Sequence, residues 1–322
     1  MLHKISHHCA RMRMTLFLST SLLSPISTLG IPTSGDSQKV STPKHLYASP
    51  PSSFSTKSPT SNPEWTLLYH HFEPPFPGRA QPIRLLFVDA GVDFLETGEN
   101  LYGPTGYCDV FRGAGPNKKI FDKTQAQKQF APYPVMAPPI IWHNRASMGK
   151  EPVFINQLPA ILRYVGTVLG YSPSSQDPGD IARCDKITLD VCDYITEGRG
   201  SFHPLDTEAS YSEQKEEGDR VSKEWSQRRM MIWLHCFEKM LEQRTCSQSE
   251  GGFVVGNCVT YADIALYWAC EATKAQFDND FYGYAWTNAD IPLLKAFKEG
   301  FDKRSNIAGW VGRFPYSGDS MM

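Results

Sequence analysis

Two histidines and an acid, His70, His71 and Glu73, form a short cluster of typical metal ligands. A metal site needs three or four ligands, and no further His or acid follows at a ligand spacing. The eight cysteines are scattered, and none forms a CxxC pair. We therefore predict no metal, and we expect reduced thiols that are mostly buried.

A glycine-rich stretch, Gly113 to Lys119, could suggest a phosphate-binding loop. The Walker pattern requires Gly, four residues and then Gly-Lys-Ser/Thr after a strand, and this stretch has neither the spacing nor the strand. The formal net charge of -2 gives no electrostatic basis for binding nucleic acid, which needs clustered Lys and Arg. No apolar run approaches the ~20 residues of a membrane helix. Neither nucleic acid nor a membrane is predicted as a partner.

Two polar motifs stand at the start of apolar helical segments. Thr260 and Asp263 have the form of a capping box, in which the hydroxyl accepts a bond from the backbone N–H three residues on and the carboxylate reaches back. Far upstream, the motif Gly78-Arg79-Ala80-Gln81-Pro82-Ile83-Arg84 opens another apolar segment, in which residues share one face at helical spacing. These residues are Ile83, Leu86, Phe87 and Ala90.

The first 63 residues differ in composition from the rest of the chain. Residues 1–35 contain bases but no acid, and residues 24–63 are crowded with Ser, Thr and Pro. Because such a segment cannot bury a core, we predict a disordered extension over residues 1–63. It is typical of a plastid or mitochondrial transit peptide, or of a signal peptide. The alternative is a plain extension, or a start codon upstream of the true start near Met14, with the protein in the cytoplasm.

Residues 64–171 have the pattern of an α/β domain. Strands are predicted there at 65–72, 140–142 and 153–155, and helices at 83–90 and 157–164. Gly91 should end the first helix, and Asn156 should cap the second. Pro139 feeds directly into a strand, where a cis bond is expected. The order of strand, helix, long link over 99–129, strand, strand and helix is that of a thioredoxin-like domain.

Residues 172–322 contain no convincing strand. Four apolar stripes at helical spacing run through residues 181–195, 221–241, 260–274 and 291–301, and a short last one begins at Ile307. A break is expected from Gly198 to Ser210. The stripes indicate core packing in an all-helical domain.

Taken together, the two helix-start motifs resemble those of helices 1 and 6 in the glutathione transferase superfamily. The resemblance covers about Thr66 to Tyr316 and is strongest to a subgroup of transferase-like proteins. It rests further on Phe130-Ala131-Pro132, Ala137-Pro138-Pro139, Phe202-His203-Pro204 and Arg304-Ser305-Asn306-Ile307-Ala308. It implies the glutathione transferase fold, a thioredoxin-like N-terminal domain followed by an all-helical C-terminal domain.

The resemblance implies a glutathione site in the N-terminal domain. Pro139 would be the cis-proline, and Pro138 would offer its backbone carbonyl to the cysteinyl amide of glutathione. Gln157 would hold the γ-glutamyl group at a helix N-terminus, where free N–H groups favour a carboxylate. Arg79 would support the same region by charge-assisted hydrogen bonds. The alternatives are a surface arginine for Arg79 and a polar helix-start residue for Gln157.

The family lowers the thiol pKa of glutathione by a hydrogen bond from a hydroxyl at the end of the first strand. Tyr69 is the only tyrosine there and is the predicted catalytic residue; the alternative is a core aromatic. It lies nine residues before Gly78, further than is usual in the family. Either the segment 74–77 is an insertion, or the hydroxyl is absent and Phe72 takes its place.

Leu158 stands where the family usually has Ser or Thr. Only its backbone N–H remains to bind the γ-glutamyl carboxylate, so glutathione affinity should fall roughly 10- to 100-fold. The predicted function is a glutathione transferase that conjugates the glutathione thiolate to a small hydrophobic electrophile, and the family implies a homodimer. The alternatives are a non-catalytic binding or assembly module of the same fold, or a glutathione-dependent isomerase or reductase.

Overall fold

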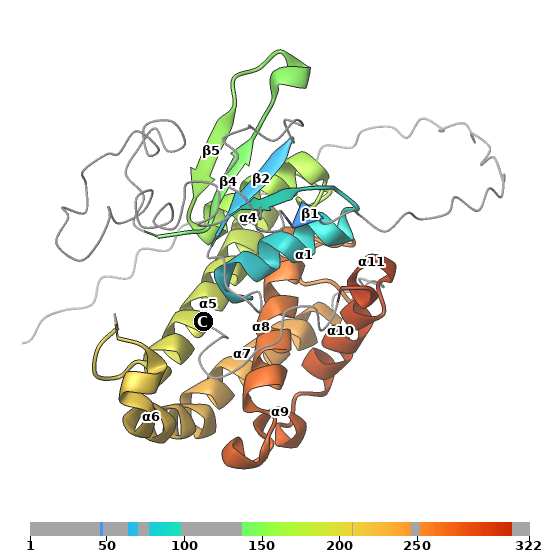
Figure 1. Cartoon of the computed structure of the whole chain (residues 1–322). Helices are drawn as coiled ribbons and strands as arrows, with labels where there is room; N and C mark the ends of the chain where they lie inside the picture. Colours follow the sequence, from blue (N-terminus) through green and yellow to red (C-terminus); the bar gives the residue numbers. More distant parts are fainter. Residues whose placement is uncertain are drawn as a thin grey trace, which may run out of the picture. The chain divides into compact units, whose positions relative to one another are not determined.

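The computed structural model describes residues 46–47, 64–69, 77–97, 137–207, 209–245 and 252–310. These described residues belong to one compact unit, in which a mixed sheet lies above a group of helices (Figure 1). Among the described residues, no helix is both long and apolar enough to cross a membrane.

The sheet has five strands in the order β1-β3-β2-β4-β5. Strands β1, β3 and β2 are parallel to one another, whereas β4 pairs antiparallel with both β2 and β5. Helix α1 (Gln81–Asp89) connects β2 to β3, and α4 (Leu158–Leu169) follows β5. The strands are β1 (Leu46–Tyr47), β2 (Trp65–Leu68), β3 (Leu95–Thr97), β4 (Ile140–His143) and β5 (Val153–Asn156).

Two strands were not predicted. β1 lies within residues 1–63, where Leu46 and Tyr47 pair with the open edge of β3. The rest of that segment lies outside the described residues. β3 was not predicted, since three residues are too few to show a strand periodicity. The predicted strands at 140–142 and 153–155 and the first helix are confirmed.

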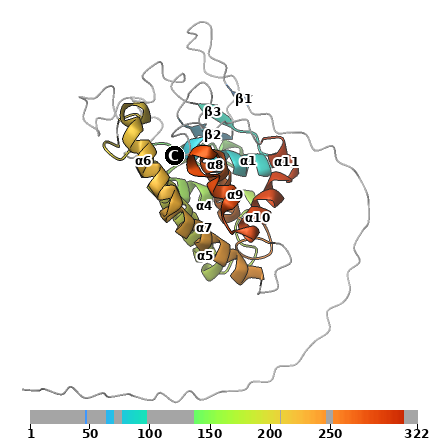
Figure 2. The same cartoon turned by 90° about the horizontal axis from the view of Figure 1, so that it is seen from below.

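The helical part is built around α8 (Tyr261–Phe277), which is buried along almost its whole length. It packs against α1, α5 (Pro178–Phe202), α9 (Ala285–Asn288) and α10 (Pro292–Asp302). Helices α6 (Lys215–Gln227) and α7 (Arg229–Thr245) follow one another along one side (Figure 2). The short elements are η4 (Tyr211–Gln214), η5 (Asp280–Tyr282) and α11 (Ser305–Ala308).

The predicted capping box at the start of α8 is confirmed. The Thr260 N–H and hydroxyl both donate to Asp263 Oδ2, at 2.8 and 2.7 Å, and the Val254 N–H donates to Asp263 Oδ1 at 2.7 Å. Asp263 is completely buried. This carboxylate therefore fixes both the start of the central helix and the turn that leads into it.

Two helix boundaries differ from the prediction. Helix α5 does not break at Gly198 but continues to Phe202, because the buried stripe extends through the last turn. The stripe at 221–241 is divided into α6 and α7 at Arg228, whose backbone leaves the helical region at φ -121° and ψ -74°. The predicted domain boundary at residues 171–172 falls in the link between α4 and α5.

Candidate functional site

Three strand ends meet at one edge of the sheet. Ile140, the first residue of β4, pairs with Leu68, the last of β2, and with Asn156, the last of β5. Tyr69, Pro139 and Gln157 each adjoin one of these paired residues. The register therefore brings three of the predicted site residues to a common edge.

The Pro138–Pro139 peptide bond is cis, as predicted for Pro139. Both prolines are buried and directly precede β4. Because neither proline has an N–H, the backbone of this dipeptide can only accept hydrogen bonds, through its two carbonyl oxygens. The position suits the predicted use of the Pro138 carbonyl as an acceptor, which stays a prediction.

Tyr69 is buried directly after β2. Its hydroxyl accepts a hydrogen bond from the backbone N–H of Arg79 at 2.9 Å. Burial raises the pKa of Tyr69 to about 12, an effect that outweighs the lowering by the nearby Arg84 guanidinium. The phenol therefore keeps its proton at neutral pH, and this is the form that can donate to a thiolate.

Arg79 lies in η1 (Gly78–Ala80), the short turn that leads into α1. Its guanidinium Nη2 donates to Thr196 Oγ1 on α5 at 2.9 Å. Its side chain thus contacts the helical part, while its backbone contacts Tyr69. The support that Arg79 was predicted to give to the γ-glutamyl region stays a prediction.

Gln157 is exposed and has φ 72°, a value that non-glycine residues rarely adopt. It is the N-cap of α4, although its side chain makes no capping bond. The prediction that Asn156 caps this helix is therefore wrong, since Asn156 ends β5. The left-handed backbone turns the chain sharply, so that the Gln157 side chain and the first N–H groups of α4 stand at the sheet edge.

Leu158 is buried, with 3% of its surface exposed. Its side chain joins the core beneath α4, so the residue has only its backbone to offer at the surface. The geometry agrees with the expectation that this position lacks a side-chain hydrogen bond for a ligand carboxylate.

Sequence reasoning missed Arg84, which is 1% exposed. It forms a buried ion pair with Glu96 on β3 and donates from Nη1 to the Pro77 carbonyl at 2.8 Å. A signal was present, because Arg84 interrupts the apolar run from Ile83 to Val88 and a charged residue in such a run is buried only with a partner.

Both ends of α1 are bonded to the helical part. At its start, Gln81 Nε2 donates to Glu271 Oε2 on α8 at 3.2 Å. At its end, Arg304 makes a two-fold contact with Asp89, from Nε at 2.7 Å and Nη2 at 2.6 Å, and the Tyr171 hydroxyl donates to the same carboxylate at 2.8 Å. Arg304 belongs to one of the segments that carried the family resemblance.

The thiols of α5 are poor candidates for a nucleophile. Burial raises the pKa of Cys184 to about 12 and that of Cys192 to about 11, so both stay protonated at neutral pH. The five described cysteines are all free. Only Cys184 and Cys270 are buried, Cys192 and Cys258 are half-buried and Cys236 is exposed, so fewer of the described thiols are buried than expected.

Three of the sequence candidates cannot be placed. His70, His71 and Glu73 lie outside the described residues, as do Phe72 and the glycine-rich stretch 113–119. Among the residues that are described, no three His, Cys, Asp or Glu side chains gather in a way that could hold a metal ion.

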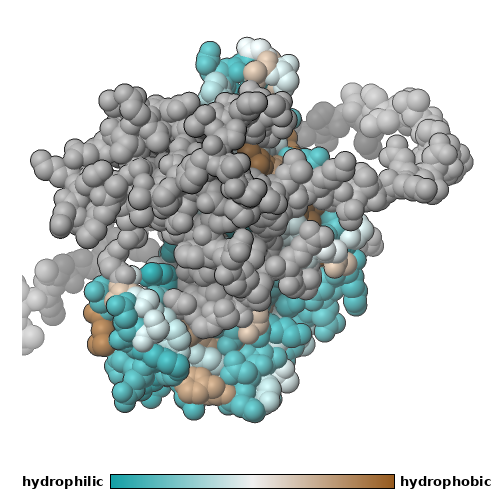
Figure 3. Space-filling view, in the orientation of Figure 1, coloured by the Kyte–Doolittle hydropathy of each residue, from teal (hydrophilic) through white to brown (hydrophobic). Residues whose placement is uncertain are grey.

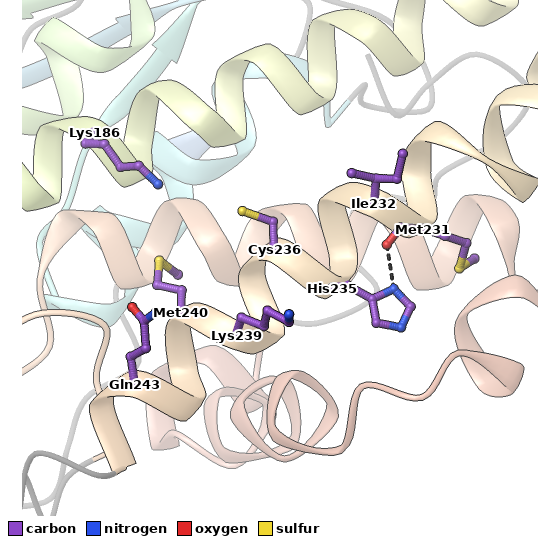
Figure 4. A pocket seen from close by; sticks show the side chains of 8 residues that line it. All are labelled: Lys186, Met231, Ile232, His235, Cys236, Lys239, Met240 and Gln243. Carbon is purple, nitrogen blue, oxygen red and sulfur yellow. Dashed lines mark hydrogen bonds between the residues drawn. The ribbon is translucent and has the colours of Figure 1, made fainter.

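A groove of about 640 Å³ runs between α5 and α7, away from the sheet edge. Lys186 comes from α5, and the other lining residues come from α7 (Figure 4). None of the predicted site residues lines it. The lining residues are Lys186, Met231, Ile232, His235, Cys236, Lys239, Met240 and Gln243.

Comparison with known proteins gives a fold for the chain and a family match for part of it. The family model of the glutathione S-transferase C-terminal domain matches residues 201–313. The solved structure of NaGST-2 is similar at 20% identity and a TM-score of 0.50, covering 79% of this chain and 98% of that one. The Pi-class glutathione S-transferase of Onchocerca volvulus is similar at 17% identity and a TM-score of 0.52, covering 80% and 99%. No curated protein matches the sequence.

At these identities the structural likeness shows the fold, a thioredoxin-like domain followed by a helical domain, as the sequence predicted. The sequence match adds the family to which the helical domain belongs. The chain thus has the fold of the glutathione S-transferases, and its residues 201–313 match their C-terminal domain.

Proposed function

We propose that this protein binds reduced glutathione at the edge of the sheet and transfers it to a hydrophobic electrophile. The observation that carries the proposal is the convergence of Tyr69, the cis Pro138–Pro139 bond and Gln157 at that edge. Each offers a different kind of contact to a tripeptide thiol: a hydroxyl, a backbone carbonyl, and a helix N-terminus with an exposed amide.

In the proposed complex the Pro138 carbonyl accepts the N–H of the cysteinyl residue of glutathione. The γ-glutamyl carboxylate lies at the start of α4, where the free N–H groups and the helix dipole stabilise it. The Gln157 side chain is exposed there and can donate to the same group. Leu158 contributes only its backbone, which predicts modest affinity.

In the proposed reaction the glutathione thiol loses its proton to solvent, and the thiolate accepts a hydrogen bond from Tyr69. The sulfur then forms a bond to the electrophilic carbon of the substrate, whose leaving group departs with the bonding electrons or whose ring opens. A protonated phenol beside the sulfur favours the thiolate over the thiol. The raised pKa of Tyr69 keeps the phenol in that form.

A second candidate is a non-catalytic binding module of the same fold. Its specific support is the burial of both Tyr69 and Leu158, the two positions where catalysis and carboxylate binding need polar groups. In that case the role of the Tyr69 hydroxyl is to accept the hydrogen bond of the Arg79 N–H and so to stabilise the turn before α1.

We also propose that the protein is a homodimer and that the segment before residue 64 directs it to a plastid or mitochondrion. The first proposal is supported by the family, and the second by the acid-free, Ser-rich composition of that segment. Imaging of the tagged full chain in cells tests the second, and an even distribution through the cytoplasm would contradict it.

Calorimetric titration of the full chain with reduced glutathione tests the site. We expect binding with a Kd between about 10 µM and 1 mM, weakened roughly tenfold in Gln157→Ala because one hydrogen bond to a charged group is lost. Gln243→Ala, at an exposed glutamine on α7, is the control and should bind like the parent. No binding at millimolar glutathione would reject the proposed ligand.

Turnover with an aryl halide or an epoxide then tests catalysis. Tyr69→Phe should lower kcat by roughly 100-fold while binding stays within about threefold, since the hydroxyl acts on the sulfur and not on the groups that hold the rest of glutathione. Tyr284→Phe, at an exposed tyrosine, should leave kcat unchanged. Equal kcat in Tyr69→Phe and the parent would favour the non-catalytic module.

A further inference from the structure

Arg84 holds three separate parts of the N-terminal domain together at Tyr69. Its Nε donates to both oxygens of Glu96, at 3.1 and 2.9 Å, and its Nη2 donates to the same carboxylate. Its Nη1 donates to the Pro77 carbonyl at 2.8 Å, and its guanidinium carbon lies 5.6 Å from the centre of the Tyr69 ring. One buried side chain thus contacts β3, the turn before α1, and the residue after β2.

The Pro77 carbonyl connects this contact to the Tyr69 hydroxyl. It accepts from Arg84 Nη1 and also from the backbone N–H of Gln81 at 3.1 Å, so the turn between them is held at both ends. Arg79 lies inside that turn, and its N–H donates to the Tyr69 hydroxyl at 2.9 Å. The position of the Arg79 N–H therefore depends on the bond that Arg84 makes to Pro77.

Glu96 holds the guanidinium in its place. The carboxylate comes from β3, at the position that pairs with Leu67 of β2, two residues before Tyr69. Two parallel N–H···O bonds fix the plane of the guanidinium as well as its position. Lysine could keep the charge, but it could not present this fork and reach the Pro77 carbonyl at the same time.

We propose that Arg84 is a positioning residue for Tyr69: it fixes the ring and the Pro77–Arg79 turn so that the hydroxyl is presented at the sheet edge in one orientation. The consequence for turnover rests on the proposed function. The consequence for the Tyr69 ring does not, because the contacts exist in the protein without a substrate.

A merely structural role predicts something different. Arg84 would then stabilise the fold as any buried ion pair does, and its loss would lower the melting temperature without acting on Tyr69 in particular. Arg304 offers the comparison, because it makes a similar two-fold bond to Asp89 at the other end of the same helix.

The experiment compares Arg84→Lys, Arg84→Met and Arg304→Met in the full chain, with tyrosine ring carbons labelled for NMR. The Tyr69 signal is assigned among the 14 tyrosines as the one missing in Tyr69→Phe. Both Arg84 variants should shift and broaden this signal, because the turn that carries the Arg79 N–H, the partner of the Tyr69 hydroxyl, is no longer fixed. Arg304→Met should lower the melting temperature and leave the signal in place.

Kinetics supply the second measurement. We expect kcat to fall roughly 10- to 100-fold in Arg84→Lys, with KM for glutathione within about threefold, since a misplaced donor acts on the thiolate and not on binding. If Arg84→Met does not fold, Arg84→Lys alone decides. An Arg84→Lys protein with the parent's Tyr69 signal and kcat would overturn the proposal, as would an equal effect of Arg304→Met. A shifted signal in a protein whose parent lacks turnover would support the positioning role and reject the proposed catalysis.

Discussion

Burial acts in opposite directions on two ring side chains of the sheet. It raises the pKa of Tyr69 and lowers that of His143, because in both cases it favours the neutral form. His143 is 1% exposed, is stacked on Trp65 at a ring distance of 3.7 Å, and bonds through Nδ1 to the Tyr164 hydroxyl at 2.9 Å. The Glu64 carboxylate, 3.3 Å from Nε2, opposes the lowering but does not reverse it.

The lowered pKa of His143 predicts a pH dependence of folding stability. The unfolded chain binds the proton near pH 6.5 and the folded chain only at lower pH, so acidification through this window favours unfolding. The free energy of unfolding should fall by up to about 1.4 kcal/mol per pH unit below pH 6.5. Above pH 6.5, His143 should not change it.

Urea unfolding at pH 7.5, 6.5 and 5.5 measures this slope. His143→Gln should show a shallower loss of stability than the parent across this range. His235→Gln, at an exposed histidine on α7, should retain the parent's slope. A parent slope that survives in His143→Gln would show that other groups carry the acid sensitivity.

At the scale of elements, the Asp263 carboxylate determines where α8 begins. It accepts three hydrogen bonds at 2.7 to 2.8 Å while completely buried. Asp263→Ala leaves the Val254 and Thr260 N–H groups without this acceptor, and each orphaned buried donor costs about 1–3 kcal/mol. We expect a loss of about 3 kcal/mol or more in the free energy of unfolding.

A second capping box offers the control for this prediction. Glu213 accepts from the Ser210 N–H at 2.8 Å at the start of η4, but on the protein surface. Glu213→Ala should therefore have a much smaller effect on thermal and urea unfolding, because water replaces the lost partner. Equal losses in the two variants would mean that burial does not set the strength of the Asp263 box.

The elements that could be predicted from sequence are those whose signals are local. A capping box joins residues three apart, and the apolar face of α1 repeats within one helix, so both were readable in the chain. The cis bond at Pro139 was readable for the same reason. β1 and β3 were not, because two or three residues become a strand only through their neighbours in the sheet.

The candidate site was predictable in part, for a similar reason. Family motifs placed Tyr69, Pro139 and Gln157, and the strand register brings them together. The apolar run around Arg84 indicated its burial, but its partner Glu96 lies on a strand that the sequence did not reveal, so the ion pair could not be foreseen. The φ of 72° at Gln157 also has no local signal, since glycine is the residue that usually adopts such a value.

At the scale of the molecule, α1 links the candidate site to the helical part. The bond from Gln81 to Glu271 lies next to the turn of Arg79, and the Asp89–Arg304 contact lies at the far end of the helix. The packing of α8 therefore acts next to the residues around Tyr69, whereas the Arg304 contact acts at the opposite end of α1. The described residues of the sheet and of the helices belong to one compact unit.

Association of two copies would need a face that the single chain leaves uncovered. Much of the described surface on the side seen in Figure 3 is hydrophilic, with scattered apolar residues. Two large apolar side chains stand out at the groove between α5 and α7: Ile232, which lines it and is 61% exposed, and Leu189, which lies one turn beyond Lys186 and is 52% exposed. Charges of both signs flank them, including the Lys186–Asp190 pair, so a two-fold axis could match opposite charges across the contact.

If the proposed homodimer uses this face, Ile232→Glu should dissociate it. A two-fold axis would place each new carboxylate in an apolar contact, and the dissociation constant should rise roughly tenfold or more because a charge must be desolvated. Leu205→Glu is the matched control, since Leu205 is 72% exposed but lies in the link between α5 and η4. Sedimentation velocity over a range of concentrations would separate the cases. This face is supported if the parent and Leu205→Glu are dimers and Ile232→Glu is a monomer. It is contradicted if the parent is a monomer, or if Ile232→Glu leaves the dimer intact.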